Sequence, residues 1–451
     1  MNEIITVLPG DPRVRKLLGP GRGAGASLRW SSFLIRQPTE DGLLLYNALT
    51  LELLHVPADL LPALESPQGE LRERLRRDWY LVPEELDQHT TVHELRELLR
   101  IVDPPKSWIR KYTVFTTTAC NARCAYCFER GWEPRTMSPE TADRAADYML
   151  AHSGRHPFRI DWFGGEPLVN RGAMDRICDR LRAGGARFES AMTTNGYLFA
   201  PETARADRER WNLIRCQITL DGTEPRYNEI KNYVCPSGSA YRRVIANVHA
   251  LAAAGVEVML RLNFDLSNAE DIRALARELG REFGDEPLVA AYAVMLYEDR
   301  NDPAGGRSGE ERARLHALRD EFFCILEAGG LRRPSRLPQA LEWHMCMADS
   351  GDMITILPEG QIGLCEQYAR DGFIGHIDRP GLDETVMEEY RTLHPEIPAC
   401  ADCPLFPGCL PLLKCPNQIC YPERRDAQIV QTRRAMLTEW KQYKQHKSQG
   451  L

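Results

Sequence analysis

The stretch YTVFTTTACNARCAYCFERG (residues 112–131) places three cysteines directly after a short β-branched and aromatic run, which has the pattern of a strand. Cys120, Cys124 and Cys127 follow the spacing CxxxCxxC. A loop of this length can wrap three thiolates around one metal cluster, and three ligands on a four-iron cube leave one iron open to a substrate or cofactor. The alternative is a zinc knuckle that lacks its fourth ligand, since His152 and His156 lie some way along the chain.

Outward from this stretch, strand-like runs alternate with amphipathic segments as far as about residue 328. The expected strands are 112–118, 158–165, 188–196, 216–222, 256–265 and 288–296. The expected helices are 138–151, 170–181, 201–211, 241–254, 268–283 and 310–327. Six consecutive strand–helix units predict an α/β fold with a parallel sheet curled into a partial (β/α)6 TIM-like barrel. Ligands of such sheets bind at the carboxyl ends of the strands.

Four further polar motifs fall at those strand ends. In chain order they are FGGEPL (163–168), TTNG (193–196), ITLDG (218–222) and RLNFDLSN (261–268). Each has an ordinary interpretation by itself: a glycine pair makes a turn, Asp221-Gly222 makes a hairpin, and Arg261 is a surface charge. Singly these motifs indicate little, but their occurrence in this order after CxxxCxxC is a specific pattern.

CxxxCxxC after the first strand of a partial barrel, followed by these motifs, resembles the radical S-adenosylmethionine superfamily over roughly residues 110–300. The resemblance implies a 4Fe-4S cluster on the three cysteines, with the amino and carboxylate groups of S-adenosylmethionine on the open iron. Reductive cleavage of the cofactor would leave a 5'-deoxyadenosyl radical, which removes hydrogen from unactivated carbon. An electron donor such as flavodoxin or ferredoxin is implied as a partner.

The resemblance also implies which residues contact the cofactor. The aromatic residue before the third cysteine lies beside the adenine in this family, and the glycine–glycine–glutamate segment meets the methionine amino group. The fifth-strand segment reaches the carboxylate or the ribose. The cofactor contacts carried over are Tyr126, Gly164, Gly165, Glu166, Thr194, Asn195, Asp221 and Arg261. No residue is assigned as a catalytic base.

Seven more cysteines lie between residues 346 and 420, in a Pro-rich region of little periodicity that begins at about residue 331. They are Cys346, Cys365, Cys400, Cys403, Cys409, Cys415 and Cys420. Seven thiolates exceed one four-ligand site, so two sites would leave one complete and one with a vacancy or a ligand from elsewhere. A zinc ribbon is the alternative.

This segment resembles the SPASM extension of peptide-modifying radical enzymes, which implies two auxiliary 4Fe-4S clusters. Cys346, Cys365 and Cys415 would hold the barrel-proximal cluster, and Cys400, Cys403, Cys409 and Cys420 the distal one. Five residues separate Cys409 from Cys415 and four separate Cys415 from Cys420, which departs from the commonest spacing. A vacancy at the proximal cluster favours a thioether to a substrate cysteine. A fully ligated cluster favours carbon–carbon crosslinking or another oxidation.

Residues 1–105 have a pattern of their own. An extended pair (32–50) precedes helical stretches at 58–66, 69–79 and 91–102, and Pro104-Pro105 ends the last one. This winged-helix-like pattern resembles the precursor-recognition modules of ribosomal-peptide maturases, which bind a leader peptide by strand addition. The arginines of the second stretch could attract an acidic leader, or form a solvated face; they are Arg72, Arg74, Arg76 and Arg77.

Composition narrows the class of protein. Lys and Arg total 57 against 64 Asp and Glu, which gives a net charge of -7 and does not favour a nucleic-acid partner. There is no secretory signal and no run of roughly 18 apolar residues, so we expect a soluble, cytoplasmic protein that spans no membrane. The cysteines outside the clusters are expected to be small buried hydrophobes; they are Cys178, Cys216, Cys235 and Cys324.

Together these patterns predict three parts: a precursor-recognition module (1–105), a radical S-adenosylmethionine barrel (106–330) and an auxiliary-cluster domain (331–451). The expected function is modification of a ribosomally made precursor peptide, by thioether or carbon–carbon crosslinking. One alternative is a protein maturase of the anaerobic sulfatase type, which oxidises cysteine or serine to formylglycine. The other is a noncatalytic peptide-binding protein braced by zinc.

Overall fold

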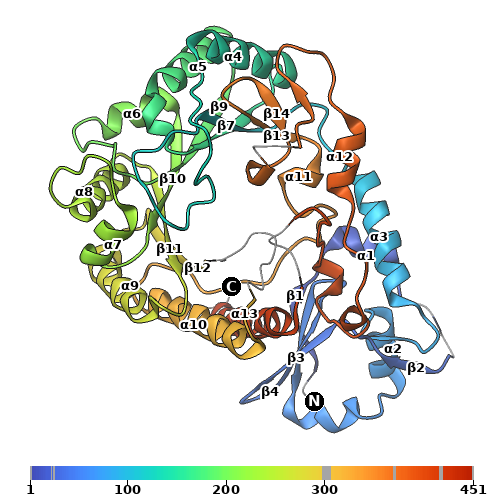
Figure 1. Ribbon diagram of the computed structural model, residues 1–451. Helices are drawn as coiled ribbons and strands as arrows, with labels where there is room; N and C mark the ends of the chain where they lie inside the picture. The colour runs from blue at the N-terminus through green and yellow to red at the C-terminus, as the bar shows by residue number, and fades with distance from the viewer. Residues whose placement is uncertain are drawn as a thin grey trace.

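The computed structural model describes residues 3–21, 23, 26–296, 306–368, 372–415 and 420–448. A curved sheet lined by helices on its outer side occupies most of the molecule (Figure 1). Six consecutive strands of this sheet are parallel, and neighbours among them are also neighbours in the chain. They are β7 (Lys111–Thr117), β8 (Phe158–Gly164), β9 (Phe188–Thr194), β10 (Leu213–Leu220), β11 (Glu257–Phe264) and β12 (Val289–Met295). The expected partial barrel is confirmed.

The expected crossover helices are also present. They are α4 (Pro139–Ser153), α5 (Arg171–Ala183), α6 (Ala204–Trp211), α8 (Ala240–Ala253), α9 (Ala269–Phe283) and α10 (Gly309–Ala328). Helix α9 illustrates why they form, because its buried side chains share one helical face: Leu275, Ala276, Leu279 and Phe283 lie three, four, seven and eleven residues beyond Ile272. One short helix was not expected, α7 (Glu224–Lys231), between β10 and α8. It carries a residue of the candidate site.

The cysteine-rich region continues the barrel sheet. Strand β13 (Met353–Ile356) pairs in parallel with β7, and β14 (Gln361–Gly363) and β15 (Gly375–His376) follow as antiparallel strands. These strands of two to four residues are too short for their period to be read from the sequence. The other elements here are α11 (Met347–Ser350), η3 (Glu366–Tyr368), α12 (Glu384–Arg391), η4 (Pro398–Cys400) and η5 (Phe406–Gly408).

The amino-terminal module contains a four-stranded antiparallel sheet of order β1-β5-β4-β3 and a separate β2–β6 pair. The strands are β1 (Ile5–Pro9), β2 (Leu28–Trp30), β3 (Leu34–Thr39), β4 (Gly42–Asn47), β5 (Glu52–Pro57) and β6 (Leu81–Pro83). The helices of this module are α1 (Pro12–Leu18), η1 (Ala58–Leu64), α2 (Gly69–Arg77) and α3 (Gln88–Val102). Outside the module, the short helical turn η2 (Pro167–Asn170) follows β8 of the barrel. The expected extended pair corresponds to the β3–β4 hairpin.

The three parts share their cores. The carboxyl-terminal helix α13 (Pro422–Ser448) packs against α10 of the barrel and against β3 of the amino-terminal module. Val92 and Leu95 of α3 lie in one hydrophobic cluster with Cys403 and Phe406, whereas Ile354 and Ile362 belong to the barrel core. The Pro-rich region is therefore held by apolar burial on both sides. The domain boundaries at 105 and 330 stay a prediction.

The isolated cysteines divide into two kinds. Cys178 and Cys216 are buried as expected, but Cys235 and Cys324 are exposed, so the expectation was wrong for these two. Cys235 lies in the loop between α7 and α8, and Cys324 is on an outward-facing position of α10. Among the described residues, no helix is long and apolar enough to cross a lipid bilayer.

Candidate active site

The CxxxCxxC loop begins just beyond the carboxyl end of β7, at the edge of the barrel where the following strands also end. Burial raises the pKa of Cys120 to about 12, and the thiols of Cys124 and Cys127 are close enough to add to this rise. Asn195 Nδ2, at the end of β9, lies 3.9 Å from Cys120 Sγ and donates to Asn121 Oδ1 at 2.7 Å. The loop therefore gathers three thiols and fixes them to the next strand end.

The donor set of this loop fits an iron–sulfur cluster. Iron deprotonates the thiols that it binds, which offsets the raised pKa of a buried cysteine. Asn121 Nδ2 is buried and has no hydrogen-bond partner within the described ranges, so it can donate to a sulfur atom. No three His, Cys, Asp or Glu side chains of the described residues are arranged for a single metal ion. A four-iron cube holds its cysteine sulfurs much farther apart than one ion does.

Glu166 joins the ends of β8 and β9. Its side chain is completely buried, and its carboxylate accepts hydrogen bonds from Leu168 N (3.1 Å), Thr194 Oγ1 (2.8 Å) and Asn195 N (2.8 Å). Burial raises the pKa of this carboxyl, and the three donors oppose that rise. Glu166 therefore fixes the positions of Thr194 and Asn195. A direct contact between Glu166 and a cofactor stays a prediction.

Two glycines let the β8 end approach the loop that carries the cysteines. Gly165 N donates to Thr117 O at 3.1 Å, and Glu166 N donates to Ala119 O at 3.0 Å. A Cβ atom on Gly165 would lie 2.5 Å from the carbonyl oxygen of Ala119. Gly164 has a φ of 119°, which side-chain-bearing residues rarely adopt. Both positions therefore require glycine for the close packing of backbone on backbone.

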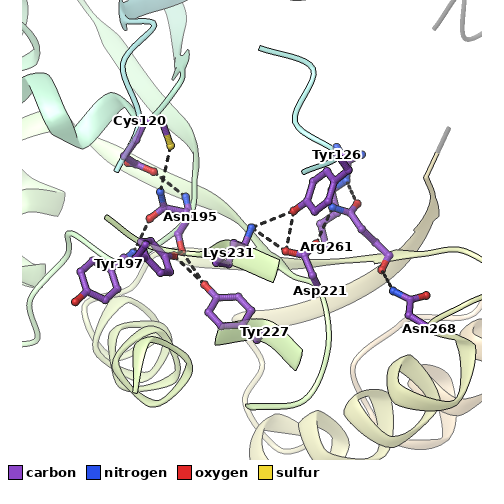
Figure 2. A network of polar contacts seen from close by, with 12 residues as sticks. Cys120, Tyr126, Asn195, Tyr197, Asp221, Tyr227, Lys231, Arg261 and Asn268 are labelled. Atoms are coloured by element: carbon purple, nitrogen blue, oxygen red, sulfur yellow. Dashed lines mark hydrogen bonds and ion pairs between the residues drawn. The ribbon is translucent and has the colours of Figure 1, made fainter. Parts of the chain in front are cut away.

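A second polar network connects the cysteine loop to β10 and β11 (Figure 2). Asp221 Oδ2 accepts from Tyr126 Oη at 2.7 Å and lies 3.0 Å from Lys231 Nζ. Asn263 Nδ2 donates to Asp221 Oδ1 at 3.0 Å, and Arg261 Nε donates to Asn263 Oδ1 at 2.9 Å. Tyr126, Asp221 and Arg261, which the sequence placed on three separate segments, are thus joined by hydrogen bonds.

Lys231 is the residue of this network that the sequence did not single out. It is 3% exposed, and its backbone carbonyl accepts from Arg123 N at 2.9 Å within the cysteine loop. Burial by itself would lower the pKa of Lys231, but the neighbouring Asp221 and Tyr126 outweigh it and raise the pKa above its ordinary value. A lysine at the end of a polar segment such as EPRYNEIK has the pattern of a surface residue, so no local signal marked it.

The inner face of the sheet lines an open cavity of about 810 Å³ toward the amino ends of the strands, where Arg159, Arg215 and Glu257 lie. Alternate residues of neighbouring strands line it, among them Gln217 on β10, Met259 on β11 and Tyr292 on β12. Tyr292 Oη donates to Gln217 Oε1 at 2.6 Å across the floor of the cavity. Charged side chains line it as well, such as Asp161, whose Oδ2 lies 2.7 Å from Lys111 Nζ. The cavity can hold a sizeable substrate with both polar and apolar groups.

The second set of cysteines forms two groups. Burial raises the pKa of Cys409 to about 11, with further contributions from its neighbours Cys420, Cys403 and Cys400. Burial likewise raises the pKa of Cys365, and the neighbouring thiols are those of Cys346 and Cys415. Cys346, Cys365 and Cys415 pack against the barrel core. Cys400 and Cys403 of the other group pack against the core of the amino-terminal module. The same two groups are implied by the resemblance to the SPASM extension, and the assignment of either group as cluster ligands stays a prediction.

The four arginines of α2 have different surroundings. Arg74 and Arg77 line a cavity of about 510 Å³ beside β1, together with Thr6 and Arg15. The side chains of the other two are engaged elsewhere: Arg72 donates to Ala26 O at 2.9 Å, and Arg76 pairs with Glu73 and donates to Gly21 O.

Residues 114–279 match the family model described as the Radical SAM superfamily. The chain is 29% identical to a GTP 3',8-cyclase of Nitrobacter hamburgensis over 181 residues, which are 38% of this chain and 49% of that protein. The chain thus spans about half the length of this curated relative.

Two solved structures are similar over more of the chain. Native anSMEcpe with bound AdoMet has a TM-score of 0.57 and 13% sequence identity, over 74% of this chain and 99% of that chain. The same protein is also known with a Kp18Cys peptide. Streptococcus suis SuiB bound to precursor peptide SuiA has a TM-score of 0.50 and 14% identity, over 85% of this chain and 95% of that chain. At these identities the likeness concerns the fold.

Proposed function

Because residues 114–279 form a radical SAM domain, we propose that this enzyme cleaves S-adenosylmethionine reductively and crosslinks a ribosomally made precursor peptide. The single observation that carries the proposal is the gathering of Cys120, Cys124 and Cys127 at the carboxyl edge of the barrel, beside Asn195 at the end of β9. Three thiolates leave one iron of a four-iron cluster free for the cofactor.

When bound, the cofactor supplies a 5'-deoxyadenosyl radical that abstracts hydrogen from carbon. The chain's own residues position and shield this chemistry. Glu166 fixes Asn195 beside Cys120, and the Asp221–Lys231 pair holds Tyr126. The cofactor would therefore bind between side chains whose positions are already fixed by hydrogen bonds. A buried, preorganised site excludes water and competing hydrogen donors.

Peptide substrates are favoured over nucleotides by the parts of the chain outside the barrel. The fold of SuiB is similar over 85% of this chain, which includes parts outside the barrel. SuiB was solved with a precursor peptide, and anSMEcpe with a Kp18Cys peptide. A peptide partner would also give the amino-terminal module a role, since a GTP-sized substrate needs no separate recognition module.

We place the leader peptide of this substrate at the amino-terminal module. Arg74 and Arg77 line the cavity beside the edge strand β1, where an acidic segment could pair with β1 and with these guanidinium groups. The Arg74 guanidinium already donates to Ile4 O at 2.9 Å and to Thr6 Oγ1 at 3.1 Å, so it is held at the strand edge.

The two cysteine groups beyond the barrel would each hold one auxiliary 4Fe-4S cluster. With the cluster on the CxxxCxxC loop, the chain would hold three. Cys346, Cys365 and Cys415 would leave one corner of the proximal cluster for a substrate thiolate, which favours a thioether product. If another side chain completes that cluster, it would instead accept an electron, which favours a carbon–carbon bond. Electrons for cofactor cleavage would come from a cytoplasmic flavodoxin or ferredoxin.

Coexpression tests this function. The enzyme is produced together with each small open reading frame encoded nearby, and the peptide is analysed by mass spectrometry. We expect a loss of two hydrogens for each crosslink with the wild-type chain and none with Cys124→Ala. An unmodified mass with an unchanged stereochemistry for every candidate peptide would contradict the proposal. Inverted residues at unchanged mass would indicate epimerisation in place of crosslinking.

A protein maturase of the anaerobic sulfatase type is the second candidate, favoured by the likeness to anSMEcpe over 99% of that chain. It would convert a cysteine or serine of a sulfatase-derived peptide to formylglycine. The two functions differ in their dependence on the amino-terminal module. Arg74→Glu with Arg77→Glu should abolish modification of a leader-dependent precursor and leave modification of a short leaderless peptide unchanged.

A further inference from the structure

Helix α3 of the amino-terminal module contacts the segment that carries the distal cysteines. His89 stacks on Phe406 with ring centroids 3.9 Å apart, and its Nδ1 lies 2.7 Å from Glu396 Oε2. Two turns further along, the guanidinium of Arg96 donates to Phe406 O at 2.8 Å and to Cys409 O at 2.6 Å. A residue of the recognition module thus reaches the backbone of a predicted cluster ligand.

Among the residues that the structure describes, the buried cation Arg96 has no carboxylate partner. It is 6% exposed, and within the described part of the chain no Asp or Glu oxygen lies at ion-pair distance from it. The nearby Glu396 carboxylate is engaged by His89 and by His93 Nε2, the latter at 2.8 Å. Arg96 Nε is buried and has no hydrogen-bond partner among the described residues. A buried cation that lacks a directly paired carboxylate destabilises the fold unless another negative charge lies nearby.

Of the four distal cysteines, Cys409 lies beside this cation, because Arg96 donates to its carbonyl oxygen at 2.6 Å. Glu396 is also close enough to act on Arg96, but its carboxylate is engaged by His89 and His93. Cys409 in turn neighbours Cys400, Cys403 and Cys420. Neutral thiols offer Arg96 no counter-charge. Four thiolates around an iron–sulfur cluster carry a net negative charge, which would be the missing one.

We propose that Arg96 is the counter-ion of the distal cluster, so that the recognition module itself sets the charge balance and the reduction potential of that cluster. The inference rests on the distal cluster of the proposed function. Reduction adds a negative charge to the cluster, and a buried cation stabilises the reduced form more than the oxidised one. Arg96 therefore raises the reduction potential of the distal cluster, as a positioning residue that touches neither cofactor nor substrate.

The test is an anaerobic redox titration of the reconstituted full chain, followed by electron paramagnetic resonance. The transition of the distal cluster is identified beforehand as the one that Cys409→Ser moves. Arg96→Met should shift this transition to a more negative potential and leave the others in place. Arg96→Lys, which keeps the charge but replaces the guanidinium that donates to the two carbonyl oxygens, should titrate close to wild type. Arg100→Met is the matched control, because Arg100 lies one turn away over the ring of Trp343.

Two results would overturn the inference: an unshifted potential in Arg96→Met at full iron content, or the same shift in Arg96→Lys as in Arg96→Met. The second would mean that the carbonyl hydrogen bonds matter and the charge does not. Loss of about four irons in Arg96→Met but not in Arg96→Lys would support the counter-ion, since one cube would then depend on the charge. The iron content of the wild-type chain tests the distal cluster separately.

Discussion

Lys231 Nζ lies 3.0 Å from Asp221 Oδ2, and neither side chain is more than 4% exposed. The pair connects three segments, because Asp221 also accepts from Tyr126 Oη in the cysteine loop and from Asn263 Nδ2 on β11. A buried pair of this kind contributes little net stability when intact, but either partner left alone is costly. The pair therefore acts mainly to fix the loop to the strand ends.

Asp221→Asn should destabilise the chain by about 3–5 kcal/mol, because it leaves the Lys231 ammonium buried without its counter-charge. Chemical denaturation of the apo-protein measures the loss. Adding Lys231→Met to this variant should recover part of it. Strictly additive losses would show that the two groups do not interact. Glu209→Gln is the control, since Glu209 and Arg205 are 61% and 86% exposed and such pairs contribute about 0–1 kcal/mol.

Gly165→Ala should disturb the cysteine loop without touching a cysteine. The added Cβ would press on the carbonyl oxygens of Thr118 and Ala119, which precede Cys120. A displacement of about 1 Å in such a site lowers a rate by about 10²-fold, so formation of 5'-deoxyadenosine should fall by that order. Gly363→Ala should react like wild type, because no atom lies within 4 Å of its added Cβ. Equal rates in both variants would contradict the close approach.

Iron analysis checks the division of the cysteines. The reconstituted wild-type chain should contain about twelve irons, as three cubes require. Cys365→Ala and Cys403→Ala should each lose up to about four, and the signals lost should belong to different clusters. Cys178→Ala is the buried control and should lose none. Zinc in place of iron beyond the barrel would remove the auxiliary clusters and favour a zinc-braced domain.

Glu52 gives the amino-terminal module a pH-dependent stability. Burial raises the pKa of Glu52 from 4.5 to about 7, although the guanidinium of Arg15 lies 2.5 Å away. The folded state therefore holds this proton more tightly than the unfolded state, and its stabilising effect is complete below about pH 4.5 and lost as pH rises through about 7. Relative to wild type, Glu52→Gln should gain up to about 3 kcal/mol between these limits. Thermal unfolding at a series of pH values measures this difference, and a constant difference would contradict the shift.

The barrel could be predicted from the sequence because its strands and helices are long enough to show their periods. Helix α9 has five buried residues at helical spacing, and β10 alternates buried Cys216, Ile218 and Leu220 with inward-facing residues. The strands beyond residue 331 could not be predicted in this way. Strand β13 has four residues, all buried, and it is a strand because it pairs with β7, which lies more than 200 residues earlier.

The site was predictable where a motif carried it and not where contacts between distant segments created it. The cysteine motif and the strand-end residues Asn195 and Asp221 do converge. Lys231 and Arg96 were missed because each lies on a charged helix segment that resembles a solvated surface. Only the fold shows that Lys231 faces Asp221 and that Arg96 faces Cys409. Glu166 was expected at the cofactor, and its local sequence gave no sign that three donors of the chain engage its carboxylate.

The most direct test of the central claim is the cleavage of S-adenosylmethionine by the anaerobically reconstituted chain under dithionite, followed by chromatography. If Cys120, Cys124 and Cys127 hold a cluster with one open iron, wild type should form 5'-deoxyadenosine and methionine, and Cys124→Ala should form neither. The absence of 5'-deoxyadenosine from wild-type protein of full iron content, or an equal amount from Cys124→Ala, would contradict the account.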